Sequence, residues 1–193
     1  PREFKTAGVF LTPEYSPDGK WIVYISKGGL FVMRAEGDSA ARALLPPSRA
    51  AEYTPVISPD GRWLAYASDE SGRTEVYVRP FPDVQLARHQ VSTVGGLAPR
   101  WSRDGHELFF IDLTDRRNLI AVPVTLTPTF SAGIPHRLFS ADPFVAPGSG
   151  FDVSPDGRRF LMTRPAGGNE KQQDELILVQ NFFEALRAKA TGK

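Results

Sequence analysis

A tetrapeptide that returns four times constrains the fold of this chain more than any other feature. Its copies begin at Ser16, Ser58, Ser102 and Ser154, and each reads Ser-Pro-Asp-Gly except the third, in which Arg103 replaces the proline. The copies start 42, 44 and 52 residues apart. A period of this size is typical of repeat architectures, in which each repeat is one supersecondary unit.

Each copy of the tetrapeptide predicts a tight turn. Proline at the second position presets φ for a type I turn, aspartate suits the third position, and glycine relieves the fourth. The serine hydroxyl can bond to backbone groups further along the turn. A metal site is disfavoured because the aspartates are a whole repeat apart, whereas calcium needs about six to eight oxygens at one point. The residues expected to build these turns are Asp18, Gly19, Asp60, Gly61, Asp104, Gly105, Asp156 and Gly157.

Short aromatic and β-branched runs flank every turn, which predicts β-strands. The runs before the turns are 13–15, 55–57, 99–101 and 151–153, and those after them are 21–24, 63–66, 108–111 and 160–162. A third run follows at 30–33, 75–78, 119–122 and 176–179, and a weaker fourth at 43–45, 89–92 and 136–139. Four antiparallel strands per repeat predict one propeller blade. A solenoid of helix pairs is excluded because proline and glycine recur inside every unit.

The sequence therefore predicts an all-β chain, a β-propeller of about four four-stranded blades. Residues 1–180 form the propeller domain, with blades at about 13–50, 55–95, 99–140 and 150–180, and residues 4–11 as an extra outer strand. A short helical tail is expected over 181–193, because Asn181 can cap it.

We expect these blades to be an arc of a larger ring rather than a closed ring. An open arc exposes blade faces and strand edges, which would drive self-association. In the alternative, a closed four-blade ring, residues 4–11 would pair with blade four.

Taken together, these residues resemble the PD40, or TolB-like, branch of WD40-like β-propellers, over residues 13–180. The run 58–82 more narrowly resembles the C-terminal propeller of bacterial serine/threonine protein kinases, as do 101–110 and 151–162. In that family the propeller follows a kinase domain and is taken as a sensory or interaction module, so the resemblance implies this role here. The chain itself has no kinase Gly-rich loop, His-Arg-Asp or Asp-Phe-Gly motif.

The net charge and composition of the chain limit the kinds of molecule that it is expected to bind. The 193 residues carry a net charge of +1, so no basic surface for nucleic acid or membrane is indicated. No apolar stretch is long enough to cross a membrane, and no cysteine is present. We expect a protein or small ligand at a propeller face or channel, no nucleic acid, no membrane insertion by this chain, and no cofactor. Either a cytoplasmic or an extracytoplasmic bacterial setting fits this composition.

A search for catalytic motifs predicts no enzyme. The three histidines, His89, His106 and His136, lie in different repeats and share no local motif. Neither a His-Glu-x-x-His zinc motif nor a Gly-x-Ser-x-Gly nucleophile elbow occurs. Any kinase or hydrolase activity would belong to a domain outside this chain.

Three charged residues form the best candidate site. Glu14, Arg100 and Asp152 occupy one equivalent position in the innermost strands of three repeats, and Val56 fills it in the remaining one. Because innermost strands surround the propeller channel, these side chains could converge on a ligand. An ion pair between blades or a solvated channel lining is the alternative.

The predicted function is a non-catalytic interaction or ligand-sensing module, the C-terminal part of a bacterial signalling protein such as a serine/threonine kinase. Two alternatives remain: a free-standing TolB-like envelope protein that binds protein partners, and the propeller of a prolyl-oligopeptidase-type serine hydrolase.

Overall fold

The computed structural model of this chain describes residues 11–36, 40–114, 117–142, 150–165 and 174–179. Every regular element within these residues is a β-strand, and all strand pairs are antiparallel. The all-β prediction is therefore confirmed. The predicted strand at 4–11 and the predicted helix at 181–193 lie outside the described residues, except that Leu11 begins β1.

The strands form four sheets, which we call blades one to four. Blade one contains β1 (Leu11–Tyr15), β2 (Trp21–Ser26), β3 (Gly29–Arg34) and β4 (Arg42–Ala43). Blade two contains β5 (Glu52–Ile57), β6 (Trp63–Ser68), β7 (Glu75–Pro80) and β8 (His89–Gln90). Blade three contains β9 (Gly96–Trp101), β10 (Glu107–Asp112), β11 (Asn118–Thr125), β12 (Ser131–Ala132) and β13 (His136–Ser140). Blade four contains β14 (Phe151–Val153), β15 (Phe160–Pro165) and β16 (Asp174–Val179).

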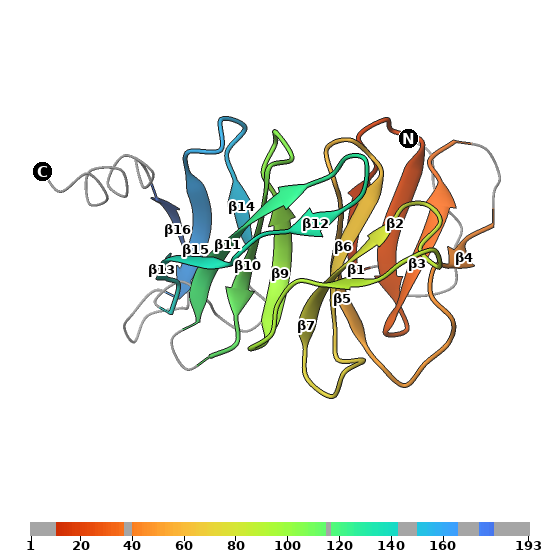
Figure 1. Cartoon of the computed structure of the whole chain (residues 1–193), viewed down its shortest axis with the longest axis horizontal. Helices are drawn as coiled ribbons and strands as arrows, with labels where there is room; N and C mark the ends of the chain where they lie inside the picture. The colour runs from red at the N-terminus through yellow and green to blue at the C-terminus, as the bar shows by residue number, and fades with distance from the viewer. Residues whose placement is uncertain (1–10, 37–39, 115–116, 143–149, 166–173, 180–193) are drawn as a thin grey trace, which may run out of the picture.

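The blades stand side by side in chain order, as the colour gradient in Figure 1 shows. Within blades one and two, strand order follows chain order, so each blade is a simple meander. Blade three differs, because β12 and β13 both pair with β11 along different parts of its length. Three strands of blade four lie within the described residues. The first strand of each blade, β1, β5, β9 or β14, is its inner strand.

The repeated tetrapeptide joins each inner strand to the second strand of its blade. Every glycine of the four copies has a positive φ, between 68° and 74°. In blade two the Ser58 hydroxyl donates to Asp60 over 2.6 Å and accepts from the Trp63 amide, while the Asp60 carboxylate accepts from the Arg62 amide. The same pattern recurs in the other three blades. Each serine–aspartate pair thus satisfies the backbone amides that the turn leaves unpaired.

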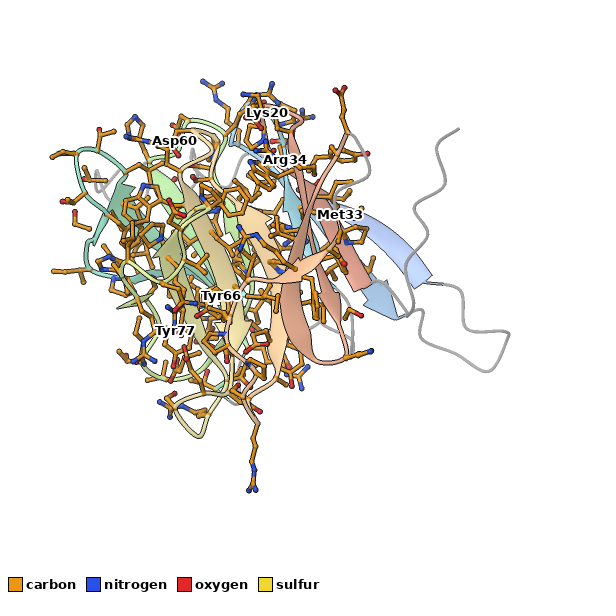
Figure 2. All side chains as sticks on the ribbon, turned by 90° about the vertical axis from the view of Figure 1, so that its right-hand side faces the viewer. Lys20, Met33, Arg34, Asp60, Tyr66 and Tyr77 are labelled. Carbon is orange, nitrogen blue, oxygen red and sulfur yellow. The ribbon has the colours of Figure 1, made fainter. Side chains whose placement is uncertain are left out.

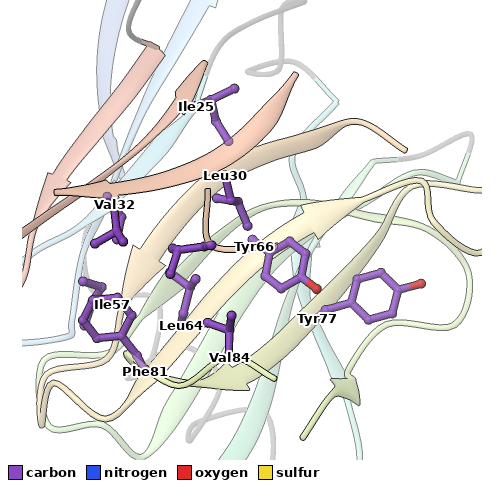
Figure 3. Close-up of a cluster of buried hydrophobic side chains, with 11 residues drawn as sticks. Ile25, Leu30, Val32, Ile57, Leu64, Tyr66, Tyr77, Phe81 and Val84 are labelled. Atoms are coloured by element: carbon purple, nitrogen blue, oxygen red, sulfur yellow. The ribbon is translucent and has the colours of Figure 1, made fainter. Parts of the chain in front are cut away.

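Neighbouring blades share their apolar cores. Because successive side chains of a strand point to opposite faces, Leu64 and Tyr66 of β6 pack against blade one, whereas Trp63 and Ala65 pack against blade three. Figure 3 shows the first of these cores, in which Leu30 and Val32 of blade one meet the side chains of blade two. Burying one such large apolar side chain stabilises the fold by about 1.5–3 kcal/mol.

The third core continues the stack. Phe109 of blade three meets Phe160 of blade four edge to face, with ring centroids 5.1 Å apart. Indole groups add polar links across the blades, because Trp101 donates to the Val56 carbonyl over 3.2 Å and Trp63 donates to the Leu126 carbonyl over 3.0 Å. The blades are therefore held in a fixed order by packing and by directed hydrogen bonds.

A first prediction tests the turn geometry at Gly61. Its φ is +74° and no atom lies within 4 Å of the place where a Cβ would stand, so a side chain there would meet backbone strain and no clash. We expect Gly61→Val to lower the free energy of unfolding by about 1–3 kcal/mol, measured by chemical denaturation. Gly61→Asn is the control, because asparagine tolerates a positive φ, and it should cost less than half as much. Coincident unfolding curves for Gly61→Val and the parent would contradict the assignment.

A second prediction concerns acid. The hydrogen bond from the Ser16 hydroxyl, followed by that from the Lys20 amide, lowers the pKa of Asp18 from 3.8 to about 2. Because this pKa is lower in the folded than in the unfolded chain, the stabilisation from Asp18 is complete above about pH 4 and is lost as the pH falls toward 2. We expect Ser16→Ala to move the pKa of Asp18 back toward 3.8, measured by carboxyl NMR titration. The pKa of Asp60 in the same sample should not change.

Candidate functional site

The inner strands share a distortion that the sequence search did not anticipate. Thr12, Thr54 and Ala98 all have positive φ values, of 47°, 45° and 53°. At each of them the pairing with the next strand shifts, so that three inner-strand steps match two on the partner. A non-glycine residue in this conformation costs about 1–2 kcal/mol, and such β-bulges re-aim the side chains that follow them.

Proline follows each bulged residue, at Pro13, Pro55 and Pro99. Proline lacks an amide hydrogen, so within a sheet it is confined to edges, strand starts and bulges. Each proline was predicted as the first residue of its strand, but the strands begin earlier, at Leu11, Glu52 and Gly96, so that each proline lies inside its strand and marks the bulge. The residue after each proline is the equivalent position singled out from sequence, occupied by Glu14, Val56 and Arg100.

The structure brings the predicted site residues together. Glu14, Val56, Arg100 and Asp152, one from each inner strand, all line a single cavity of about 440 Å³. The rest of its wall comes from the ends of the inner strands and the turns after them: Ile57, Pro59, Trp101, Ser102, Arg103, Val153 and Pro155. The cavity therefore lies at the end of the blades that carries the repeated turns. Figure 2 shows that end for blades one and two, with Lys20 and Asp60 at its edge and Tyr66 and Tyr77 further down.

The charged side chains of this cavity influence one another. Burial, the largest cause, raises the pKa of Glu14 above 4.5; the positive charge of Arg100 acts against this, and the negative charge of Asp152 adds to it. The Arg100 guanidinium donates to the carbonyl of Pro99 over 2.9 Å, which orients the side chain. Asp152 is exposed and accepts a hydrogen bond from the Val153 amide over 2.8 Å. The cavity thus presents two carboxylates and a guanidinium to one space.

This arrangement can bind charged groups. Carboxylates accept hydrogen bonds from ammonium groups, and a guanidinium can bind a carboxylate with two parallel bonds. The one hydroxyl in the wall, that of Ser102, donates to Asp104 and accepts from the Glu107 amide, so it is engaged in its turn. His106 and His136 are exposed outside the cavity, and His89 contacts the ring of Trp63.

Among the described residues, no group of three or more His, Cys, Asp or Glu side chains could hold a metal ion. In the same part of the chain, no helix is long and apolar enough to cross a membrane.

Solved structures show which fold this is. TolB from Acinetobacter baumannii matches 89% of this chain with a TM-score of 0.66 at 15% identity, and the match covers 40% of that protein. A putative TolB from Agrobacterium tumefaciens matches 93% of this chain and 79% of its own length, with a TM-score of 0.53 at 15% identity. A puromycin-hydrolysing peptidase from Mycobacterium tuberculosis matches 89% of this chain and 31% of its own length, with a TM-score of 0.59 at 21% identity.

These likenesses confirm the predicted TolB-like β-propeller fold. This chain spans less than half of the Acinetobacter protein. No protein-family model matches it, and no curated protein matches it by sequence. At such low identities the likeness shows the fold alone, and the matches include both TolB and a peptidase, so fold does not decide activity.

A third prediction tests whether the charged residues act on one another. Asp152→Asn should lower the pKa of Glu14, because it removes a nearby negative charge, and Arg100→Gln should raise it, because it removes a positive one. Carboxyl NMR titration of Glu14 in each variant measures both shifts. Asp83→Asn, an exposed change outside the cavity, is the control and should leave this pKa unchanged. If Glu14 titrates alike in all three variants, the three groups do not share a site.

Proposed function

We propose that this chain is a non-catalytic β-propeller module that binds a zwitterionic ligand in the cavity between its four inner strands. The ligand would carry an ammonium and a carboxylate group, as a free amino acid or a short peptide does. The single observation that carries this proposal is the placement of Glu14, Arg100 and Asp152 around one cavity of about 440 Å³.

Charge complementarity supports a zwitterion over a singly charged ligand. Glu14 and Asp152 would accept hydrogen bonds from the ammonium group, while Arg100 would bind the carboxylate. Arg103, also in the wall, brings the cavity close to electrical balance. Val56 and Trp101 supply apolar surface for the part of the ligand between its charged ends. A cation or an anion alone would leave one of the two charge types without a partner.

The bulges support a binding role as well. Strained backbone conformations persist only where the surrounding structure over-determines them, and they cluster at functional sites. Here the same strain recurs in β1, β5 and β9, directly before the residues that line the cavity. Ligand sensing at these positions would account for strain that strand pairing alone does not need.

The wider setting is a signalling protein. The resemblance of residues 58–82 to the propellers of bacterial serine/threonine kinases supports a sensory module attached to a kinase. The likeness to a peptidase supports a second candidate, a propeller that gates a hydrolase domain. The sequence adjoining this chain in its gene distinguishes a kinase domain, a hydrolase domain and a free-standing propeller.

Our fourth prediction uses the tripeptide Ala-Ala-Ala with free termini as the probe. We expect saturable amide shifts around Arg100, Trp101 and Asp152 in NMR titrations. Arg100→Gln and Asp152→Asn should each weaken binding about tenfold or more, since a hydrogen bond to a charged group contributes about 1.5–3 kcal/mol. Blocked peptides identify the contacts: the C-terminal amide should be insensitive to Arg100→Gln, and the N-acetylated peptide to Asp152→Asn.

Arg62→Gln is the matched control, because it removes a positive charge at the same end of the blades without touching the cavity. Equal affinity in the parent and both cavity variants, or no saturation at all, would contradict the proposed site. Hydrolysis of the probe that is abolished by one substitution in this chain would overturn the non-catalytic role.

A further inference from the structure

A second cavity, of about 340 Å³, lies at the opposite end of the blades from the repeated turns. It is framed by the hairpin between β2 and β3 and by residues 43–52, which connect blade one to blade two. The hairpin loop is Lys27–Gly28, both with positive φ, because Ser26 pairs with Gly29. Glu52, the first residue of β5, is the acidic residue in its wall.

Glu52 carries a buried carboxyl group that forms no ion pair with the residues that the structure describes. Only 6% of its surface is exposed, and the Leu30 amide donates a hydrogen bond to it. Within the described residues, no basic side chain forms an ion pair with it, and the nearby Arg79 instead pairs with Glu70. A buried carboxylate that lacks a counter-charge is costly. This position is therefore complementary to a cation.

Glu75 shows how this fold satisfies a buried carboxylate when no ligand is involved. It is only 1% exposed, yet Arg73 lies 2.6 Å from one of its oxygens and the Gly95 amide donates to both. The Ser92 hydroxyl donates to it as well.

Asp112 is also buried and has no ion-pair partner among the described residues, but it accepts from the Thr114 hydroxyl and from the backbone and side-chain amides of Asn118. Glu52 has neither an equivalent of Arg73 nor such a set of side-chain donors among the described residues.

The walls around Glu52 offer acceptors and apolar surface. Pro46 and Pro47 have no amide hydrogen, so this part of the wall presents carbonyl groups only. The amides of Ala50 and Ala51 already donate to Ser48 and Asp69. Apolar lining comes from Leu30, Phe31 and Leu45. The charged donors of this wall, Lys27 and Arg49, are both exposed to solvent.

Gly29 keeps the space beside the carboxylate open. A Cβ built there would stand 3.7 Å from a Glu52 oxygen, where a ligand atom could otherwise approach. Its φ is not in the left-handed region, so backbone conformation alone does not require glycine. The missing side chain instead leaves room next to the buried charge.

We propose that this cavity binds a primary alkylammonium group on an unbranched chain, with Glu52 as its counter-ion. A primary ammonium has three donors and a compact charge, which suits one carboxylate among carbonyl acceptors. The narrow apolar wall suits the methylene stem. A lysine side chain of a partner and a free alkylamine share this chemistry.

The surroundings of Glu52 make binding depend on pH. Burial, the largest cause, raises the pKa of Glu52 from 4.5 to about 7; the Leu30 hydrogen bond and the charge of Arg79 act against this, and the charges of Glu70 and Asp69 add to it. The other charged groups in the wall, Lys27 and Arg49, are exposed and therefore screened by solvent. Only ionised Glu52 attracts a cation, so affinity should rise as the pH increases through 7, and binding should release a proton near that pH.

The fifth prediction uses n-butylammonium chloride as the probe, added to the full chain at about pH 8.5 and at about pH 5.5. We expect saturable amide shifts at Gly28, Gly29, Leu30 and Ala51 with a Kd of about 1 mM, and affinity at least tenfold lower at the acidic pH. The neutral isostere 1-butanol should not saturate the site. Glu52→Gln should abolish binding, and Gly29→Ala should weaken it without changing the charge.

Asp152→Asn, in the other cavity, is the matched control and should bind the probe like the parent. A blocked peptide with one central lysine distinguishes the two sources: saturation by the peptide supports a partner protein, and saturation by the amine alone supports a small ligand. Binding that survives Glu52→Gln, or that is equal at both pH values, or the absence of saturation by either probe would overturn the proposal.

Discussion

The rest of the structure depends on the burial of both faces of each central blade. A sheet that is apolar on both sides cannot be stable alone, and it is covered here by a blade on either side. The alternation along β6, where Leu64 packs on one neighbour and Ala65 on the other, is the local form of this constraint. Because each core belongs to two blades, the inner strands have to lie next to one another. That is what creates a cavity whose wall contains residues from every blade.

Polar groups at the two ends of the blades border this apolar packing. At one end, every turn satisfies its own backbone through a serine and an aspartate, so the blades can stack without covering the turns. At the other end, buried carboxyl groups lie beside the cores, and their polar partners differ. Glu75 has Arg73 as a partner, whereas Glu52 has only a backbone amide and an open cavity. The same scaffold thus carries a satisfied charge and an unsatisfied one in a single blade.

The two cavities also differ in the kind of energetic cost that goes with them. In the cavity near the turns, strain in the backbone at Thr12, Thr54 and Ala98 re-aims the side chains that follow. In the cavity at the other end, the cost is electrostatic and resides in the carboxyl group of Glu52. Both costs are of a kind that a bound ligand can offset, because a ligand can use the re-aimed charges or neutralise the buried one.

Much of the architecture was determined by the sequence itself. Turn chemistry and the aromatic, β-branched character of the flanking runs are local, so the repeat predicted the strands, the turns and the propeller fold. The same period placed Glu14, Arg100 and Asp152 at one equivalent position. The sequence also carried the signal for the bulges, a proline inside three strands, although its meaning depends on pairing register.

Only the tertiary structure decided what surrounds each side chain. Arg100 and Asp152 are far apart in the chain, and their shared cavity arises from the stacking of blades three and four on the others. Glu52 looks like an ordinary charged residue at the start of a strand, and nothing local shows that it is buried without a counter-charge. Burial and pairing are long-range properties, since they depend on which blade faces which. The sequence period determines the blades, and the packing between blades determines the burial and the partners of each side chain.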